Sequence, residues 1–127
     1  MIDKEKVIDY WKKHAVYDME TAESLFASRR YPYCLFMCHL AVEKLLKSII
    51  VETTSEHAPY THNLVELATR SGASFDEEQK SLIAELNEFN IEARYPDWKR
   101  DFYARATEDF TARYLTKTKD LFLWLGR

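Results

Sequence analysis

Hydrophobic residues recur at three- and four-residue steps along most of this chain, which is the spacing of amphipathic helices. The clearest run extends from Tyr33 to Val51 and is apolar on almost every side, although Glu43, Lys44 and Lys47 lie in its middle. A helix that is apolar all round is normally surrounded by other helices. We therefore expect this run to form the central helix of the molecule, with a length of about 30 Å.

The same spacing predicts four further helices, and several of them begin at a recognisable signal. Asp3 and Asn63 are N-cap residues, and residues 74–79 contain two overlapping capping boxes. The expected helices cover residues 3–28, 63–70, 74–95 and 107–125. Residues 52–62 are expected to form the main loop. Residues 96–106, which are charged and aromatic without a clean period, are expected to be an exposed, partly ordered loop.

Composition supports a single helical domain. The 127 residues are 46% hydrophobic, which is enough for one core, and the chain is too short for two. Only two Gly and three Pro occur, far fewer than the tight turns of an all-β fold require. Because the connections are short, the expected fold is an all-α, up-and-down four-helix bundle with one short additional helix, formed by residues 1–127 as one domain.

The net charge and the two cysteines indicate which partners and which cellular compartment to expect. The formal net charge is −3, so the strong positive charge of a dedicated duplex-DNA-binding protein is missing. Cys34 and Cys38 lie one helical turn apart, where a mutual disulfide is disfavoured, and are expected to be small buried residues in a reducing compartment. The sequence has no secretory h-region and no apolar stretch of membrane length. We expect a cytoplasmic protein without membrane contact.

The first candidate site is the polar group on the expected central helix. His39, Glu43 and Lys47 are four residues apart and share one face. They form either an exposed pair on the helix surface or, together with Asp18 of the first helix, a partly buried charge network that fixes the register of the bundle. His62, just before the short helix, is expected to tie the long loop to the bundle. We interpret all five residues as structural.

Signatures of catalysis and cofactor binding are absent from the sequence. It contains no Gly-rich phosphate loop, no Gly-x-Ser-x-Gly elbow, no Cys-x-x-Cys pair and no His-Glu-x-x-His helix. His39, Glu43, His57 and His62 can be combined into a metal site on paper, but their spacing matches no ligand motif. We therefore expect no cofactor, no metal and no catalytic residue.

The second candidate site is the turn around Pro96. It combines cations that suit phosphate with aromatic rings that suit bases or an apolar partner surface. The residues expected to bind nucleotide, RNA or a partner protein are Arg94, Tyr95, Asp97, Trp98, Lys99 and Arg100. The alternative is structural: Arg94 pairs with an acidic helix end, and Tyr95 closes the end of the bundle.

Four motifs occur in an order that resembles a known family. They are residues 11–26 with Tyr17-Asp18, Ala41-Val42-Glu43-Lys44-Leu45-Leu46-Lys47, Thr61-His62-Asn63-Leu64 and Ala93-Arg94-Tyr95-Pro96-Asp97. Over nearly the whole chain they resemble the HEPN domain, named for its occurrence in higher eukaryotes and prokaryotes and for proposed nucleotide binding. The resemblance implies a four-helix bundle with a short extra helix, a homodimer, and a minimal nucleotidyltransferase as partner in a toxin–antitoxin-like pair.

The resemblance also bears on enzymatic activity. Active members of the family are metal-independent ribonucleases whose motif is an Arg followed about four to six residues later by a His. Here Arg94 stands at the start of the motif, but Trp98, Lys99 and Arg100 occupy the later positions and no His follows His62. The usual general acid or base is therefore missing. We expect a module that binds nucleotide, RNA or a partner protein without cleaving RNA.

Two other functions remain as hypotheses. In the first, the protein is a metal-independent toxin ribonuclease with a divergent active site, in which Arg94 stabilises charge on the phosphate and another residue replaces the His. In the second, the bundle encloses a pocket for a small ligand, which would be detected as ligand-dependent thermal stabilisation.

Overall fold

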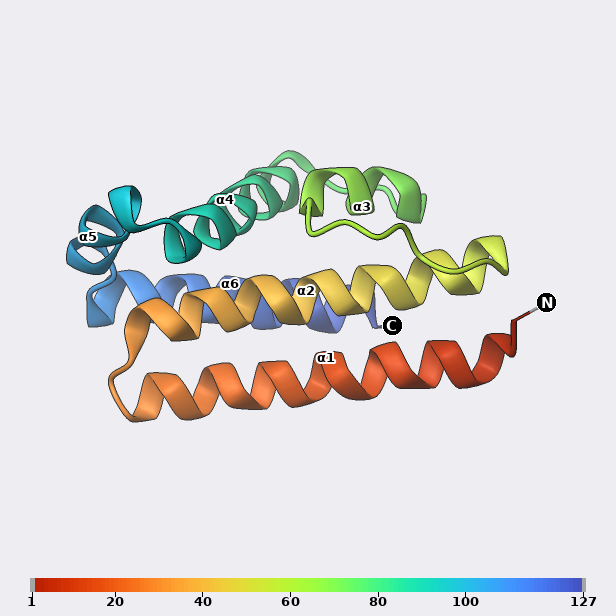
Figure 1. The fold of residues 1–127 in the computed structure, drawn as a ribbon, viewed down its shortest axis with the longest axis horizontal. Coiled ribbons are helices and arrows are strands. Elements are labelled where there is room, and N and C mark those ends of the chain that lie inside the picture. The colour runs from red at the N-terminus through yellow and green to blue at the C-terminus, as the bar shows by residue number, and fades with distance from the viewer. Residues whose placement is uncertain (1, 127) are drawn as a thin grey trace.

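All regular secondary structure in the part of the chain that the structure describes is helical. The structure is a computed structural model, which describes residues 2–126 and, of residues 96–98, the backbone only. The helices are α1 (Lys4–Ala27), α2 (Tyr31–Thr54), α3 (Leu64–Ser71), α4 (Glu77–Arg94), α5 (Pro96–Arg105) and α6 (Glu108–Leu125) (Figure 1). The predicted all-α class is therefore confirmed. No helix in the described range is long and apolar enough to cross a membrane.

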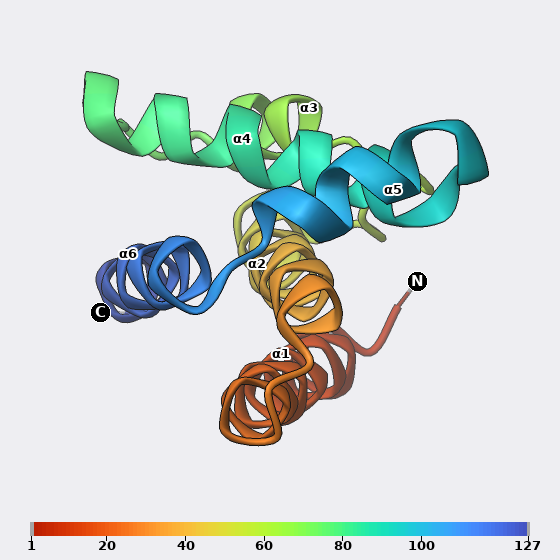
Figure 2. The ribbon, with the colours of Figure 1, turned by 90° about the vertical axis from the view of Figure 1, so that its left-hand side faces the viewer.

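Helix α2 is the central helix, as its apolar run predicts. It contacts α1, α3, α4, α5 and α6, and its residues Leu35, Val42 and Leu46 are completely buried. In Figure 2, which looks along the bundle, α2 lies between α1 and α4, with α6 beside it. The helix begins at Tyr31, earlier than the apolar run, because Pro32 is compatible with the first helical turn.

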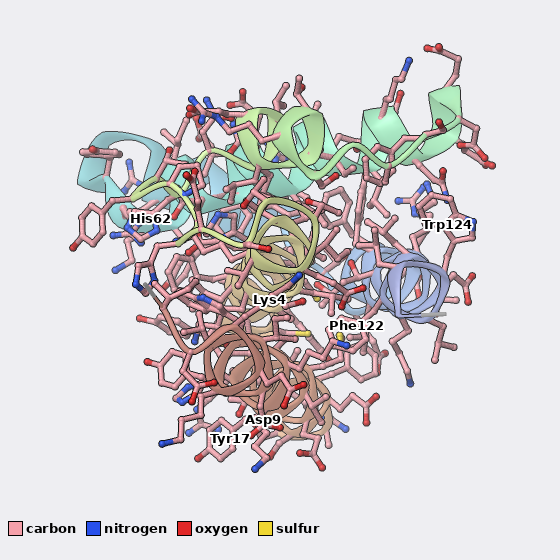
Figure 3. All side chains as sticks on the ribbon, turned by 90° about the vertical axis from the view of Figure 1, so that its right-hand side faces the viewer. Lys4, Asp9, Tyr17, His62, Phe122 and Trp124 are labelled. Carbon is pink, nitrogen blue, oxygen red and sulfur yellow. The ribbon has the colours of Figure 1, made fainter. Side chains whose placement is uncertain are left out.

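The four long helices alternate in direction along the chain. In Figure 1, α1 and α4 run one way and α2 and α6 run the other, which is the expected up-and-down arrangement, and α3 is the expected short additional helix. Figure 2 shows α4 crossing obliquely over α2. No helix of the described residues covers the side of α2 that faces away from α6, and the loop between α2 and α3 runs along this open side (Figures 2 and 3).

Side-chain caps set the helix starts where the sequence predicts them. Asp3 and Asn63 each accept hydrogen bonds from backbone N–H groups in the first turn of α1 and α3. Asp76 and Gln79 form a reciprocal capping box at the start of α4. Each cap contributes about 1 kcal/mol to the stability of its helix. The helix starts are therefore determined by local side-chain chemistry.

The expectation of a loop at residues 96–106 is wrong. Pro96–Arg105 form helix α5, which ends at Ala106. Its anchor is Phe102, which is completely buried and whose ring centre lies 5.6 Å from that of Phe89 in α4. A short helix held by one large side chain leaves no periodic apolar signal, and this is why the sequence pattern did not reveal it.

Candidate functional site

Glu43 is a buried carboxylate in the middle of α2. It is only 3% exposed, and its oxygens lie 3.3 Å from Nζ of Lys47, 3.0 Å from Nδ1 of His62 and 3.5 Å from Nε2 of His39. Lys47 is buried as well, with its Nζ over the ring of Trp11. This burial excludes the interpretation of Glu43 and Lys47 as an exposed pair. We call Glu43, His39, Lys47 and His62 the Glu43 cluster.

His39 is a neutral, completely buried member of the Glu43 cluster. Its Nε2 lies 3.2 Å from the backbone carbonyl oxygen of His62, and because a carbonyl can only accept, Nε2 carries the proton. Its Nδ1 has no hydrogen-bond partner among the described residues. Burial lowers the pKa of His39 to about 4, and the nearby Glu43 carboxylate offsets this effect only in part. His39 therefore holds the loop without adding a charge.

Asp18 belongs to a different ion pair. It is buried in α1, and its carboxylate lies 2.6 Å from Nζ of Lys44. Lys44 takes this role because it follows Glu43 directly and therefore points about 100° away from it, toward α1. The structure thus divides the expected network in two. The Asp18–Lys44 pair joins α1 to α2, and the Glu43 cluster joins α2 to the loop.

His62 is the member of the Glu43 cluster that reaches solvent. Its side chain is 54% exposed, and its Nδ1 donates to the Glu43 carboxylate. Its Nε2 has no hydrogen-bond partner within the described part of the chain. Figure 3 shows His62 on the side of the molecule opposite Phe122 of α6. His62 therefore ties the loop to α2 and presents one oriented imidazole to solvent.

Arg94 is the exposed last residue of α4. Its Nε donates to Oδ1 of Asn90 at 2.7 Å, and its Cζ lies 5.4 Å from the ring centre of Phe36. No carboxylate of the described residues pairs with it, since the nearby Glu92 pairs with Arg105 at 3.0 Å. An amide and a ring hold the guanidinium in place, while its two Nη atoms have no hydrogen-bond partner in the described chain.

The other residues expected at this site lie around the start of α5. Tyr95 is 57% exposed and therefore does not close the end of the bundle. Nζ of Lys99 lies 5.6 Å from the ring centre of Tyr103, and Arg100 is exposed. Two expected residues fall outside the described side chains, namely Asp97 and Trp98.

Several aromatic rings that line this face of the molecule were not predicted from the sequence. The rings of Phe36 and His39 are 6.0 Å apart. Those of Tyr33 and Tyr103 are 6.3 Å apart, and a hydrogen bond with Tyr33 raises the pKa of Tyr103 to about 12. The available signal was the three-residue spacing of Tyr33, Phe36 and His39, which places neighbours on one side of α2.

Three surface cavities lie away from this face. Cavities of about 390 and 630 Å³ lie between α4 and α6 and between α3 and α4. A third, of about 300 Å³, lies between the end of α2 and the loop, next to His57. Neither Arg94 nor His62 lines any of the three. Among the described residues, no group of three His, Cys, Asp or Glu side chains is arranged to hold a metal ion.

The fold and the motifs together define the class of protein. The family model of the HEPN domain matches residues 8–127, so the chain belongs to the HEPN domain family. A solved structure with a similar fold is the crystal structure of TT1696 from Thermus thermophilus, with a TM-score of 0.79, coverage of 94% of this chain and 95% of that chain, and 16% sequence identity. At this identity the likeness shows the fold alone. The comparison with curated proteins gives no match.

Proposed function

We propose that this HEPN-domain protein binds the phosphate groups of nucleotide or RNA at the turn between α4 and α5, without cleaving RNA. The observation that carries the proposal is the arrangement of Arg94, an exposed guanidinium fixed by Asn90 and Phe36 with no carboxylate partner among the described residues. A guanidinium that is already oriented loses little entropy when it binds phosphate through two parallel hydrogen bonds.

Neighbouring charges favour the same ligand. Lys99 and Arg100 follow Arg94 on helix α5, and the carboxylate of Glu92 is neutralised by Arg105. The whole chain carries a net charge of −3, so this local group of cations, rather than the overall field of the protein, attracts phosphate.

The proposed context is a homodimer that pairs with a minimal nucleotidyltransferase in a toxin–antitoxin-like unit. Membership of the HEPN family supports it, and so do the large hydrophobic side chains that a partner would cover, which include Tyr10 and Val16 on α1 and Leu123 on α6. Light scattering and co-purification with a co-expressed nucleotidyltransferase test this context. A chain that stays monomeric and unbound contradicts it.

Binding of labelled nucleotide and single-stranded RNA, measured by fluorescence polarisation, tests the Arg94 site. Arg94→Gln is expected to weaken binding roughly tenfold to hundredfold, because a hydrogen-bonded charge is lost. Arg113→Gln is the matched control, since Arg113 of α6 also lies over an aromatic ring, that of Phe110. Equal losses in both variants, or no loss in either, contradict the proposal.

A second candidate function is that of a metal-independent toxin ribonuclease with a divergent active site. It is favoured by His62, whose Nδ1 donates to the buried Glu43 so that Nε2 is available to accept a proton. Arg94 would stabilise charge on the phosphate. This function predicts growth arrest on expression and RNA cleavage that disappears in Arg94→Ala and in His62→Gln. Absence of cleavage by freshly purified protein on several RNA substrates eliminates it.

A further inference from the structure

Aromatic rings and cations alternate along the open side of α2. Six residues make up this surface, which we call the α2 track: Tyr33, Tyr103, Lys99, Phe36, Arg94 and His62. They come from α2, α4, α5 and the loop before α3. Two groups of contacts hold them: Tyr33 and Lys99 contact Tyr103, and Arg94 contacts Phe36, next to which His39 leads to His62.

The first part of the α2 track lies where α5 meets the start of α2. Tyr33 and Tyr103 meet edge to face, with an angle of 77° between their ring planes, and Nζ of Lys99 lies over the Tyr103 ring. The two tyrosines are 48% and 40% exposed. Asp101 lies two residues from both Lys99 and Tyr103 and so projects from a different side of α5. This part therefore offers exposed rings next to a cation.

The second part follows along α2 toward the loop. Arg94 lies over the ring of Phe36, and the Phe36 ring contacts that of His39. Nε2 of His39 in turn donates a hydrogen bond to the backbone carbonyl oxygen of His62. Glu43, a carboxylate beside this part of the track, is buried and bound by its own partners. Between Tyr33 and Glu43 the helix rises about 15 Å, so the track is longer than a single nucleotide needs.

The two end-on views agree that this surface is accessible. In Figure 2 the side of α2 opposite α6 has no covering helix, and in Figure 3 His62 lies on that same side. The track therefore borders solvent at Tyr33, Tyr103, Arg94 and His62, with α4 and α5 on one flank and α1 on the other, while the loop covers α2 at His39.

We propose that the α2 track binds a short single strand of nucleic acid, with bases stacked on the rings of Tyr33 and Tyr103, phosphates held by Lys99 and Arg94, and His62 at the far end of the strand. This inference rests on the proposed function. It extends that function from binding a phosphate group at Arg94 to binding several linked nucleotides along α2. Rings and cations in alternation suit a single strand because every base has a π-face and every linkage has a charge. A duplex keeps its bases stacked inside and cannot use the rings.

The test compares hexauridylate with uridine 5′-monophosphate. Wild-type protein is expected to bind the hexamer at least tenfold more tightly. Tyr103→Ala should weaken hexamer binding about tenfold, because one stacked base is lost, and should leave mononucleotide binding unchanged. Tyr103→Phe keeps the ring and should stay within about twofold of wild type. The matched control is Tyr17→Ala, since Tyr17 is 68% exposed and lies on α1 at the far edge of the molecule (Figure 3).

Lys99→Gln, which removes no ring, provides an independent variant in case Tyr103→Ala does not fold by circular dichroism. It should weaken hexamer binding more than mononucleotide binding. Equal affinity for the two ligands, or hexamer affinity that is unchanged in every folded track variant outside Arg94, overturns the strand site. If Arg94→Gln still weakens mononucleotide binding in that case, the proposed function stands without the track. If neither ligand binds, both proposals fail.

Discussion

The two sides of α2 bury polar chemistry in opposite ways. Toward α6, Cys34 and Cys38 are completely buried. The hydrogen bond with Cys34, together with burial, raises the pKa of Cys38 well above its ordinary value, despite a bond to Thr118 of α6. Toward the loop, His39 and Glu43 are buried just as deeply. The side facing α6 therefore keeps its groups neutral, whereas the side facing the loop holds a carboxylate among partners that bind it.

This contrast predicts how substitutions on each side of α2 change the free energy of unfolding. Neutral, well-packed groups lose mainly contact area when they are altered. A buried charge that loses its partner keeps the full cost of its desolvation. Substitutions on the side facing the loop are therefore expected to lower the free energy of unfolding more. On that side, His62 both contacts the buried Glu43 and reaches solvent, so it belongs to the Glu43 cluster and to the proposed α2 track.

The largest effect is expected from removing the buried carboxylate. Glu43→Ala leaves the ammonium of Lys47 buried without its partner and should lower the free energy of unfolding by about 3–5 kcal/mol, measured by urea denaturation. Glu52→Ala on the same helix is the control. Glu52 is 59% exposed and 3.8 Å from Lys12, so the loss should stay below about 1 kcal/mol. Equal losses in the two variants would contradict the contrast.

The next effect is a loss of stability in acid. His39 has a pKa of about 4 in the folded protein and about 6.5 in the unfolded chain, so the unfolded state binds more protons between these two values. The contribution is fully present above about pH 6.5 and falls as the pH drops. By pH 4 the free energy of unfolding should have decreased by up to about 3 kcal/mol.

Urea denaturation between pH 7 and pH 4 measures this effect. Glu43, Arg94 and His62 face His39 and contribute to its electrostatic environment, so the wild-type profile alone does not isolate the imidazole. His39→Asn removes it, and the difference between the two profiles gives its share. His14→Gln, at an exposed position of α1, should leave the wild-type slope unchanged. An unchanged slope in His39→Asn would show that His39 is not the group responsible.

The parts of the fold that the sequence predicts are those with local signals. The apolar run of α2 and the caps Asp3, Asn63 and Asp76 lie within the segments that they organise, and the corresponding helices are formed. Helix α5 has a Pro in its first turn but no periodic apolar pattern, because it is held by Phe102 against another helix. A contact between helices leaves no periodicity in the sequence.

The partners within the site were harder to predict, because they depend on how the helices are rotated and crossed. Spacing alone places three residues of the Glu43 cluster on one face, but the position of α1 decides that Asp18 pairs with Lys44. The contact between Arg94 and Phe36 likewise requires α4 to cross over α2. Spacing along one helix therefore predicts which residues share a face more readily than it predicts which residues of other helices they contact.

The smallest effect on stability is expected at the solvent end of the Glu43 cluster. His62→Gln keeps a side-chain donor for Glu43, and the His62 side chain is half exposed, so the loss should be at most about 1 kcal/mol. His57→Gln, at the other end of the loop, should cost nothing measurable. If His62→Gln lowers the free energy of unfolding as much as Glu43→Ala does, the His62 imidazole is needed to compensate the buried charge of Glu43. If the loss is small, the cluster keeps its structure without the imidazole, and any change in RNA binding reports contact between His62 and the ligand.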